Sequence, residues 1–381
     1  MEYAGLKKTA SLKKLIVTGC LSERYKDEIL SEIPEIDTIV GASNYDDIVK
    51  AIDTDEKKLL SDINYLSDKV GGRIVTTNAG MAYLKIAEGC NKMCTYCAIP
   101  YIRGRYRSIP MQELLKSAET LVADGISELV LVAQETTLYG TDIYGRKALP
   151  DLLRELCRID DLKWIRIMYC YPEEITDELI EVIAKEDKIC NYLDIPIQHS
   201  EDVILKKMGR RTSKSELRGL IKKLKNKIPD ISIRTTLISG FPGETKEMHE
   251  ALLDFVDEME FDRLGVFTFS PEDGTPAASF ENQVDSDTAD TWKDEIMALQ
   301  QEISYDKNQD FIGKVIEVHI EGYMPEEDAY VGRTYRDAPD VDGMVFVDAP
   351  YELMSGDFVN VKIIDANEYD LTGEICDEFT E

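Results

Sequence analysis

The sequence is poor in cysteine and histidine, and it has no long hydrophobic run. Its 381 residues include eight cysteines and three histidines, which are too few for the dense disulfide framework of a small secreted protein. No window reaches the roughly 18 consecutive apolar residues that a membrane-spanning helix requires. Residues 1–14 also lack the apolar core of a signal peptide. We therefore expect a cytoplasmic protein.

Basic residues are scarce relative to acidic ones. The chain has 44 Lys and Arg against 74 Asp and Glu, which gives a formal net charge of −30. A protein that binds nucleic acid has to neutralise phosphates with basic side chains gathered on one face. We therefore do not expect stable tRNA binding, and a basic protein partner fits the charge better.

The rest of the composition is typical of a globular protein with two or three domains, because 43% of the residues are hydrophobic and 8% are aromatic. Residues 1–72 contain a predicted strand at 14–18 and a predicted helix at 21–33, but no complete core of their own. We interpret them as the remainder of an N-terminal α/β domain. The stretch 71–80 begins with two glycines and continues with polar residues, which is typical of a linker.

Residues 76–308 are predicted to form an α/β unit, a partial (β/α)6 barrel similar to a TIM barrel. Apolar runs alternate there with helical stretches, and parallel strands cannot be joined without a crossover connection. Continuous apolar runs such as 129–132 indicate strands that are covered on both faces. In such a barrel the chemistry gathers at the C-terminal ends of the strands. The expected strands are 83–87, 128–133, 164–169, 192–197, 231–239 and 263–269.

A predicted helix at 287–308 leads into residues 309–381, which we expect to form a small β-barrel. Short alternating strands are predicted there at 315–320, 344–347 and 358–364. From residue 310 to the end, 19 acidic and four basic residues give a formal charge of −15. A region with this charge would repel RNA phosphates and attract a basic protein. A merely solvated acidic surface is the alternative interpretation.

Three of the eight cysteines lie close together, directly after the first predicted strand of the barrel. Cys90, Cys94 and Cys97 have the spacing Cys-x3-Cys-x2-Cys. Three thiolates in one short loop can hold three irons of a 4Fe-4S cube and leave the fourth iron open for a substrate. A structural zinc site is the alternative, but it needs four ligands, usually in two separated pairs. The sequence has no second Cys pair or Cys/His pair for such a site.

The other cysteines and the histidines are scattered, and each is interpreted first as an ordinary structural residue. These residues are Cys20, Cys157, Cys170, Cys190, Cys376, His199, His249 and His319.

The cysteine loop, at this position in a βα barrel, resembles that of the radical S-adenosylmethionine (SAM) superfamily. The resemblance implies that Cys90, Cys94 and Cys97 form the catalytic centre and hold a 4Fe-4S cluster. It also implies that SAM chelates the open iron, and that an electron from the reduced cluster breaks a sulfur–carbon bond to give a 5′-deoxyadenosyl radical. The interior of a barrel would keep this radical away from water.

Several residues near the expected strand ends are predicted to contact the cofactor. Gly240, Gly243 and Glu244 follow the fifth strand, where a similar stretch lies against the adenine in radical SAM enzymes. A plain strand-to-helix turn is the alternative. Arg234 is an isolated charge within an apolar strand and needs a partner, for which the SAM carboxylate is a candidate. The other predicted contacts are Tyr96, Gln134, Glu135 and Gln198.

Over nearly the whole chain, the sequence resembles the methylthiotransferases of this superfamily, and its last region resembles their TRAM domain. The shared stretches include 17–25 (VTGCLSERY) and 99–105 (IPYIRGR). Two branches compete. The MiaB type modifies an adenosine of tRNA, whereas the RimO type modifies the β-carbon of an aspartate in the small-subunit ribosomal protein twelve. The stretches that favour the RimO type are 192–199 (YLDIPIQH), 233–236 (IRTT), 270–276 (SPEDGTP) and 332–343 (GRTYRDAPDVDG).

The resemblance to the RimO type implies a second 4Fe-4S cluster, which three N-terminal cysteines hold and which takes part in sulfur insertion. Cys20 matches the third of these ligands, but the first two would precede Met1. We therefore expect an N-terminally truncated member of the family, with an incomplete ligand set for this cluster. Reconstituted protein should contain about four irons per chain, whereas about eight would show that other ligands compensate.

The leading expectation is a methylthiotransferase that uses one SAM as methyl donor and another as radical source, with an electron donor such as flavodoxin or ferredoxin. Two alternatives stay open: a tRNA methylthiotransferase, and a non-catalytic iron–sulfur or zinc protein that binds the ribosome. Tyr96, Arg103 and Arg105 lie near the cysteine loop and are candidates for holding the substrate aspartate.

Overall fold

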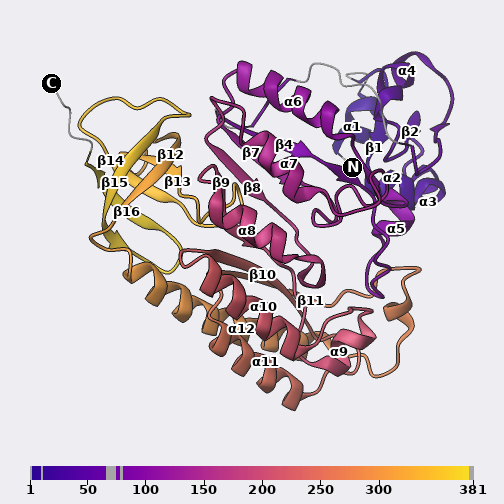
Figure 1. The fold of residues 1–381 in the computed structure, drawn as a ribbon. Coiled ribbons are helices and arrows are strands. Elements are labelled where there is room, and N and C mark those ends of the chain that lie inside the picture. Colours follow the sequence, from indigo (N-terminus) through magenta and orange to yellow (C-terminus); the bar gives the residue numbers. More distant parts are fainter. Residues whose placement is uncertain (1, 10–11, 66–73, 78–79, 377–381) are drawn as a thin grey trace.

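The computed structural model describes residues 2–9, 12–65, 74–77 and 80–376. Its strands form a three-stranded parallel sheet, a six-stranded parallel sheet, a closed five-stranded barrel and a two-stranded ribbon. The six-stranded sheet, called the central sheet below, lies between the N-terminal region and the barrel, which is called the C-terminal barrel (Figure 1). The mixed α/β architecture and the small barrel predicted from the sequence are thus confirmed.

The N-terminal region is built on the three-stranded sheet, with order β1-β2-β3. The predicted helix at 21–33 is two helices, because the chain leaves the helical conformation at Tyr25, with φ −114° and ψ 28°. The predicted linker at 71–80 lies largely outside the described residues. The elements are α1 (Glu2–Lys8), β1 (Ile16–Thr18), α2 (Cys20–Arg24), α3 (Lys26–Glu32), β2 (Thr38–Val40), α4 (Ile48–Asp53) and β3 (Lys58–Leu59).

The central sheet has the strand order β11-β10-β9-β8-β7-β4, and all neighbouring strands are parallel. Six strands were predicted, and all six are present. The fourth begins and ends three residues earlier than predicted, because the predicted range includes Pro196, which has no N–H for a ladder hydrogen bond. The strands are β4 (Met81–Lys85), β7 (Glu128–Val132), β8 (Trp164–Ile167), β9 (Ile189–Asp194), β10 (Ser232–Ser239) and β11 (Arg263–Thr268).

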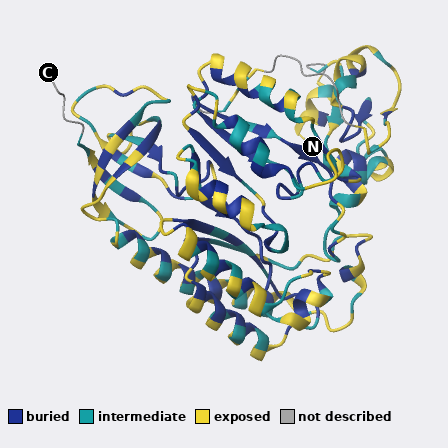
Figure 2. Ribbon diagram, in the orientation of Figure 1, coloured by how far each residue is buried: buried dark blue, intermediate teal, exposed yellow. Residues whose placement is uncertain are grey.

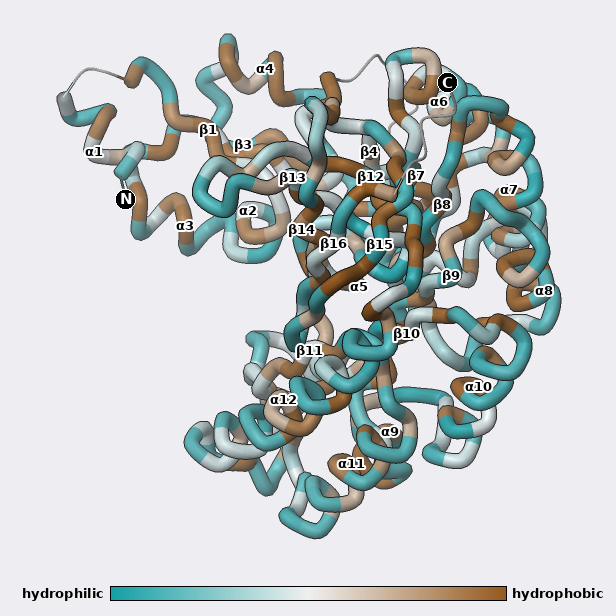
Figure 3. The backbone as a smooth tube through the Cα atoms, turned by 90° about the vertical axis from the view of Figure 1, so that its left-hand side faces the viewer, coloured by the Kyte–Doolittle hydropathy of each residue, from teal (hydrophilic) through white to brown (hydrophobic). Residues whose placement is uncertain are grey.

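Helices cover the outer face of the central sheet, and their own outer faces are exposed (Figure 2). The largest cluster of buried apolar side chains joins these helices to the strands, and Figure 3 shows hydrophobic residues along the central strands. These helices are α6 (Met111–Ala123), α7 (Leu149–Leu156), α8 (Asp177–Lys185), α9 (Asp202–Lys207), α10 (Lys214–Lys227), α11 (Lys246–Met259) and α12 (Ser286–Gln309). Helix α5 (Ile99–Arg103) lies apart from them and contacts α2.

The C-terminal barrel closes in the order β12-β13-β14-β16-β15 around a separate apolar cluster. Buried and exposed side chains alternate along its strands. In β15, Val359, Val361 and Ile363 are buried, whereas residues 360, 362 and 364 are exposed. This alternation is the signal that predicted the barrel. Two of its strands, β13 and β16, were not predicted. The strands are β12 (Val315–Met324), β13 (Ala329–Arg333), β14 (Val345–Asp348), β15 (Phe358–Ala366) and β16 (Leu371–Ile375).

Among the described residues, none of the helices combines the length and the apolar character that crossing a membrane would need.

Candidate active site

The cysteine loop runs from the ribbon strand β5 (Ala87–Glu88), which pairs with β6 (Arg107–Ser108), to helix α5. Gly89 begins the loop with φ +80°, and a Cβ on it would lie 2.2 Å from the carbonyl oxygen of Arg105. The Cys90 N–H donates to the Gly104 carbonyl at 3.1 Å. Glycine at position 89 is therefore needed both for its backbone angle and for this close approach.

The three cysteine thiols of the loop lie at different depths. Cys90 and Cys94 are buried, and Cys97 is half-buried. Burial raises the pKa of Cys90 to about 11 and also raises that of Cys97, and the nearby Cys94 adds to both effects. Removing the protons from such thiols requires a compensating cation, which is what binding to iron supplies. The donor set fits an iron–sulfur cluster, whose metal is soft and prefers sulfur.

No three His, Cys, Asp or Glu side chains in the described part of the chain converge closely enough to share one metal ion. A 4Fe-4S cube does not require such convergence, because each of its cysteines binds a different iron at a separate corner. The arrangement of the three cysteines is therefore compatible with the cube that the spacing predicts.

A wall of cationic and aromatic side chains borders the cysteine loop. Tyr171 lies with its hydroxyl 3.5 Å from the Cys94 sulfur, and its ring is 4.1 Å from the Arg210 guanidinium carbon and 4.8 Å from the Lys92 ammonium. Lys92 forms ion pairs with Glu173 and Glu174. The wall therefore brings positive charge next to the position of the cluster.

Arg210 is the member of this wall whose charge is least compensated. Its side chain is buried, and Nη2 donates to the Pro196 carbonyl at 2.8 Å. Nε and Nη1 have no hydrogen-bond partner in the described structure. Because an uncompensated buried guanidinium is costly, these two donors indicate that an anionic group belongs beside the loop. Arg210 was not predicted from the sequence, since it follows Gly209 and no local pattern marks it.

A cavity of about 430 Å³ opens beside the cysteine loop at the C-terminal ends of β9 and β10. Tyr96 of the loop lies on one side of it, and its ring packs edge-on against Phe241 at 6.4 Å. The predicted cofactor contacts Gln198 and Arg234 also line it. The structure therefore brings Tyr96, Gln198 and Arg234 to one cavity, as the barrel geometry predicts.

Some of the other predicted cofactor contacts are engaged within the protein. The Glu244 carboxylate accepts from the N–H groups of Gly240 and Phe241 at 2.7 and 3.1 Å, and lies 3.2 Å from His199. The Gln134 side-chain oxygen accepts from the Gly89 N–H at 2.7 Å. These contacts shape the turn after β10 and the cysteine loop. The cofactor roles of Gln134, Gly240 and Glu244 stay predictions.

The two glycines of the turn after β10 are required for different reasons. A Cβ on Gly240 would lie 2.4 Å from the Cβ of Ala289 on α12, whereas Gly243 has φ +86° and an added Cβ there would meet only the flexible end of Lys207. The strand-to-helix turn that the sequence left open therefore accounts for both glycines, and a contact with adenine stays a prediction.

Glu135, at the end of β7, is fully buried. One carboxylate oxygen accepts from the Thr137 N–H at 3.0 Å and from its hydroxyl, while Oε2 has no partner among the described residues. Burial raises the pKa of this carboxyl to about 7. A buried acceptor without a partner marks Glu135 as a candidate for a ligand contact.

Cys20 lies at the start of α2, next to α5, the helix that follows the cysteine loop. Its sulfur accepts from Nε and Nη2 of Arg103 at 3.3 and 3.0 Å, and Arg103 also lies 3.5 Å from the Glu88 carboxylate. Arg105 lines a second cavity of about 400 Å³, together with Cys90 and Tyr101. Of the two arginines predicted as substrate contacts, Arg103 thus binds Cys20, whereas Arg105 borders the cysteine loop.

Most of the remaining cysteines and histidines lie in ordinary structural surroundings, but neither ring nitrogen of His319 has a hydrogen-bond partner among the described residues. Cys170 and Cys190 are buried, whereas Cys157 and Cys376 are half-buried. His249 is buried, with Nε2 2.7 Å from the Glu295 carboxylate and its ring stacked on Trp292. His319 is buried 3.5 Å from Glu128.

Comparison with known proteins matches two family models to this chain. The model described as the Radical SAM superfamily matches residues 84–256, and the model described as the TRAM domain matches residues 312–376. Among solved structures, the cobalamin-dependent S-adenosylmethionine radical enzyme OxsB gives a TM-score of 0.48 at 12% identity, over 79% of this chain and 45% of that one.

Curated relatives match almost the whole chain. The ribosomal protein uS12 methylthiotransferase RimO of Lachnoclostridium phytofermentans is 53% identical over 377 residues, which cover 98% of this chain and 86% of that protein. The protein of the same name from Acetivibrio thermocellus is 46% identical over 97% of this chain and 84% of its own length. That of Clostridioides difficile is 47% identical over 99% of this chain and 86% of its own length.

Proposed function

Because the chain belongs to the RimO family of ribosomal protein uS12 methylthiotransferases, we propose that it attaches a methylthio group to the β-carbon of an aspartate in that ribosomal protein. The observation that carries the proposal is 53% identity over 98% of the chain to a relative of that name. The cysteine loop beside a cavity at the strand ends supplies a site for the chemistry.

In this proposal, Cys90, Cys94 and Cys97 hold a 4Fe-4S cluster. When bound, the cluster and SAM supply the radical chemistry that removes a hydrogen atom from the substrate carbon. Arg210 provides positive charge beside the loop through its two donors without protein partners. The apolar rings of Tyr96, Phe241 and Phe269 pack around the cavity and limit the access of water.

Glu135 and Gln198 are the predicted cofactor contacts that the surroundings favour most. Glu135 has a buried acceptor oxygen without a protein partner, which suits the ammonium group of SAM. Gln198 is buried with φ +71° and lines the cavity, so its side chain can meet the cofactor there. A non-glycine residue held at positive φ is typical of a functional position.

The substrate partner we propose is a basic protein, and the charge of the C-terminal barrel supports this. Of the four basic residues after position 309, Arg333 is buried against Glu128 of the central sheet and Arg336 against Asn308 of α12. Only Lys314 and Lys362 remain exposed, among ten exposed acidic side chains between residues 310 and 376. Such a surface attracts a basic ribosomal protein and repels tRNA, so we do not propose stable tRNA binding. The activity would take place in the cytoplasm, with flavodoxin or ferredoxin as electron donor.

Cys20 does not by itself fit a second cluster. It supplies a single thiolate, and its sulfur accepts from Nε of Arg103 at 3.3 Å. We therefore derive no step through a second cluster, and propose only that Cys20 is the residue of this chain that corresponds to one of its ligands.

The proposal is tested by product analysis. Anaerobically reconstituted and reduced protein is incubated with SAM, with inorganic sulfide as the source of sulfur, and with either a peptide containing the target aspartate of uS12 or unmodified tRNA, and the products are analysed by mass spectrometry. Replacement of one hydrogen of the peptide by SCH3 is the expected result. The matched control carries Cys157→Ala, outside the loop, beside a variant that carries Cys94→Ala.

The other outcomes each exclude a part of the proposal. Modification of tRNA alone would show that the acidic surface had been misinterpreted. A protein that never cleaves SAM to 5′-deoxyadenosine would be a non-catalytic binding factor. Cleavage of SAM without modification of either substrate would leave the radical chemistry intact and contradict the proposed substrate for this chain.

A further inference from the structure

We propose that Asp342, carried by the C-terminal barrel, is a positioning residue for Arg234. It holds the Arg234 guanidinium in the 430 Å³ cavity beside the cysteine loop, where this group receives a carboxylate of a reactant. The inference rests on the proposed function and deepens it. The carboxylate is that of SAM or that of the substrate aspartate, and the experiment below distinguishes the two sources.

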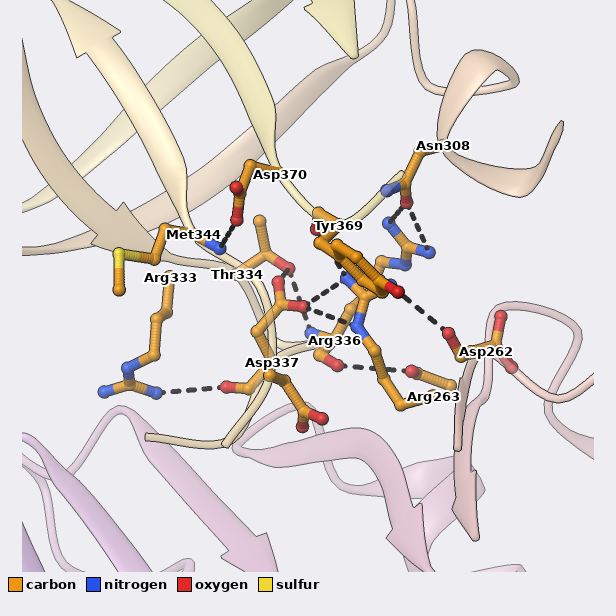
Figure 4. Close-up of polar contacts among 12 residues, drawn as sticks. Asp262, Arg263, Asn308, Arg333, Thr334, Arg336, Asp337, Met344, Tyr369 and Asp370 are labelled. Carbon is orange, nitrogen blue, oxygen red and sulfur yellow. Dashed lines mark hydrogen bonds and ion pairs between the residues drawn. The ribbon is translucent and has the colours of Figure 1, made fainter. Parts of the chain in front are cut away.

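The first step is that the loop 333–343 of the C-terminal barrel closes the N-terminal end of the central sheet. Arg333 donates to the Glu128 carboxylate at 2.8 Å, and Asp337 accepts from Arg263 at 2.6 Å. The Ser232 hydroxyl donates to the Arg336 carbonyl at 3.2 Å. Glu128, Ser232 and Arg263 are the first residues of β7, β10 and β11. Figure 4 shows Arg263 and Asp337 facing each other across this contact.

The second step is that Asp342, at the end of this loop, is fixed in place. One carboxylate oxygen accepts from the Tyr192 hydroxyl at 2.8 Å and from the Ala338 N–H at 2.9 Å. The other lies 3.3 Å from Nε of Arg234. Only 2% of the Asp342 side chain is exposed. The contact with Arg234 is therefore set by the C-terminal barrel and by β9 together.

The third step is that Arg234 points into the cavity. Residues 234, 236 and 238 alternate with buried residues along β10, and all three line the 430 Å³ cavity. Nη1 of Arg234 donates to Asp194 at 3.1 Å, whereas Nε lies beside Asp342. Its Nη2 makes no hydrogen bond with any residue that the structure describes. Two carboxylates thus orient the guanidinium and leave one of its donor groups for a ligand.

The fourth step concerns the charge that an incoming carboxylate meets. Burial raises the pKa of both Asp194 and Asp342, and the pairing of both carboxylates with Arg234 offsets part of this effect. A guanidinium binds a carboxylate through charge-assisted hydrogen bonds whose strength depends on its orientation. Because SAM and the substrate aspartate both carry a carboxylate, an oriented arginine in this cavity has a reactant to receive.

The test is a double-mutant cycle on the cluster-loaded full chain. The variants are D342N, D342E, R234Q and the double variant D342N/R234Q. The matched control is D340N, because Asp340 is an exposed residue of the same loop that makes no hydrogen bond or ion pair with another described side chain. Binding of SAM is measured by the change it causes in the EPR spectrum of the reduced cluster. Binding of the aspartate peptide is measured against its asparagine analogue, and thermal unfolding shows whether each variant folds.

We expect D342N to weaken the binding of one reactant by roughly tenfold, with D342E recovering part of the loss and D340N within about twofold of the unmodified protein. In the R234Q background, D342N should have almost no further effect. Loss of SAM affinity identifies the SAM carboxylate, whereas loss of the preference for aspartate over asparagine identifies the substrate.

Unchanged affinity for both reactants in a folded D342N protein would overturn the inference, and so would independent effects of D342N and R234Q. A protein that binds SAM but does not bind the peptide contradicts the proposed substrate. In that case the inference stands if D342N weakens SAM binding, and it is overturned if D342N does not.

Discussion

Gly89 has a backbone conformation that other residues adopt only under strain, and it has no room for a side chain. The conformation, at φ +80°, and the 2.2 Å approach of the Arg105 carbonyl to an added Cβ coincide one residue before Cys90. We predict that G89A displaces the cysteine loop and lowers the iron content of reconstituted protein from about four per chain to well below one. Iron analysis and the absorption spectrum of the cluster measure the loss.

Gly145 supplies the control for this substitution. It also has a positive φ, at +69°, but an added Cβ would meet no atom within 4 Å. G145A should therefore cost only about 1 kcal/mol of backbone strain and leave the iron content unchanged. Equal iron loss in both variants would show that strain alone, rather than the contact with Arg105, disturbs the loop.

Glu135 should make the stability of the protein depend on pH. Its pKa is raised by burial to about 7 in the folded state, whereas it is about 4.3 in the unfolded chain. Between these two values the carboxyl is ionised in the unfolded chain but still neutral in the fold. The stability that the neutral carboxyl contributes is thus fully present below about pH 4.3 and is lost as the pH rises through about 7. E135Q removes this dependence, so it should gain stability relative to the unmodified protein, by on the order of 2 kcal/mol between pH 5.5 and 8.

The measurement is the thermal unfolding midpoint of both proteins over this range of pH. Glu155 is the control position, because its carboxylate is paired with Arg158 on the exposed face of α7 and has little effect on stability. If the difference between E135Q and the unmodified protein stayed constant with pH, Glu135 would be ionised in the fold throughout, and its unpaired oxygen would have to be solvated.

The roles of single residues divide into those that local sequence can reveal and those that it cannot. Cys90, Cys94 and Cys97 lie within eight consecutive positions, so their spacing predicts a shared site. Arg210 meets Tyr171 and Pro196, and Arg234 meets Asp342 more than a hundred residues away. Such partners are brought together only by the fold. For this reason the sequence predicted that Arg234 needs a partner and offered the SAM carboxylate, but it did not predict the pairs with Asp194 and Asp342.

At the scale of elements, β7 is joined to β8 and β13 by one buried carboxylate. Glu128 accepts from Arg166 at 2.9 Å and from Arg333 at 2.8 Å, and none of the three side chains is more than 2% exposed. Burial opposes the charge of Glu128, but the two arginines hold its pKa well below the usual range. We predict that E128Q lowers the free energy of unfolding by about 3–5 kcal/mol, because it leaves the buried Arg166 without a counter-ion and Arg333 with Glu321 alone.

Chemical denaturation of E128Q at neutral pH measures this loss, and E155Q again serves as the exposed comparison. The depressed pKa of Glu128 stabilises the fold above about pH 4.3, and this stabilisation is lost as the pH falls from there through the folded-state pKa. The difference in free energy of unfolding between E128Q and the unmodified protein should therefore shrink in acid. A loss below about 1 kcal/mol at neutral pH would mean that the central sheet and the C-terminal barrel are not held together by this pair.

The elements themselves were predicted where apolar runs are continuous and missed where they are short or polar. β7 is a run of buried apolar residues after Glu128 and needed only its pattern. β13 and β16 each contain a glycine and few buried side chains, so their strand conformation depends on pairing within the closed barrel. The break at Tyr25 likewise has no local signal, because the flanking residues are good helix formers.

At the scale of the whole molecule, the acidic charge is concentrated by the way the parts are joined. Two of the four arginines and lysines of the C-terminal barrel are buried, Arg333 against Glu128 of the central sheet and Arg336 against Asn308 of α12. The solvent face of this barrel is therefore more acidic than its sequence suggests, and the loop that carries these arginines also closes one end of the central sheet. The same segment thus joins the region that would attract a basic partner to the cavity where the chemistry is proposed.

The last prediction concerns the rate at which the ribosomal protein associates with this surface. Glu326 and Glu327 are exposed in the turn between β12 and β13, and E326K/E327K replaces two negative charges by positive ones. Association should become slower by about threefold to tenfold at low salt, and the difference should fade as salt screens the charges over about 10 Å or less. Stopped-flow measurements with uS12 at several ionic strengths give both quantities. The control E119K/D124K makes the same change in net charge on α6 and the residue that follows it, so an equal slowing there would assign steering to the net charge of the chain and not to the C-terminal barrel.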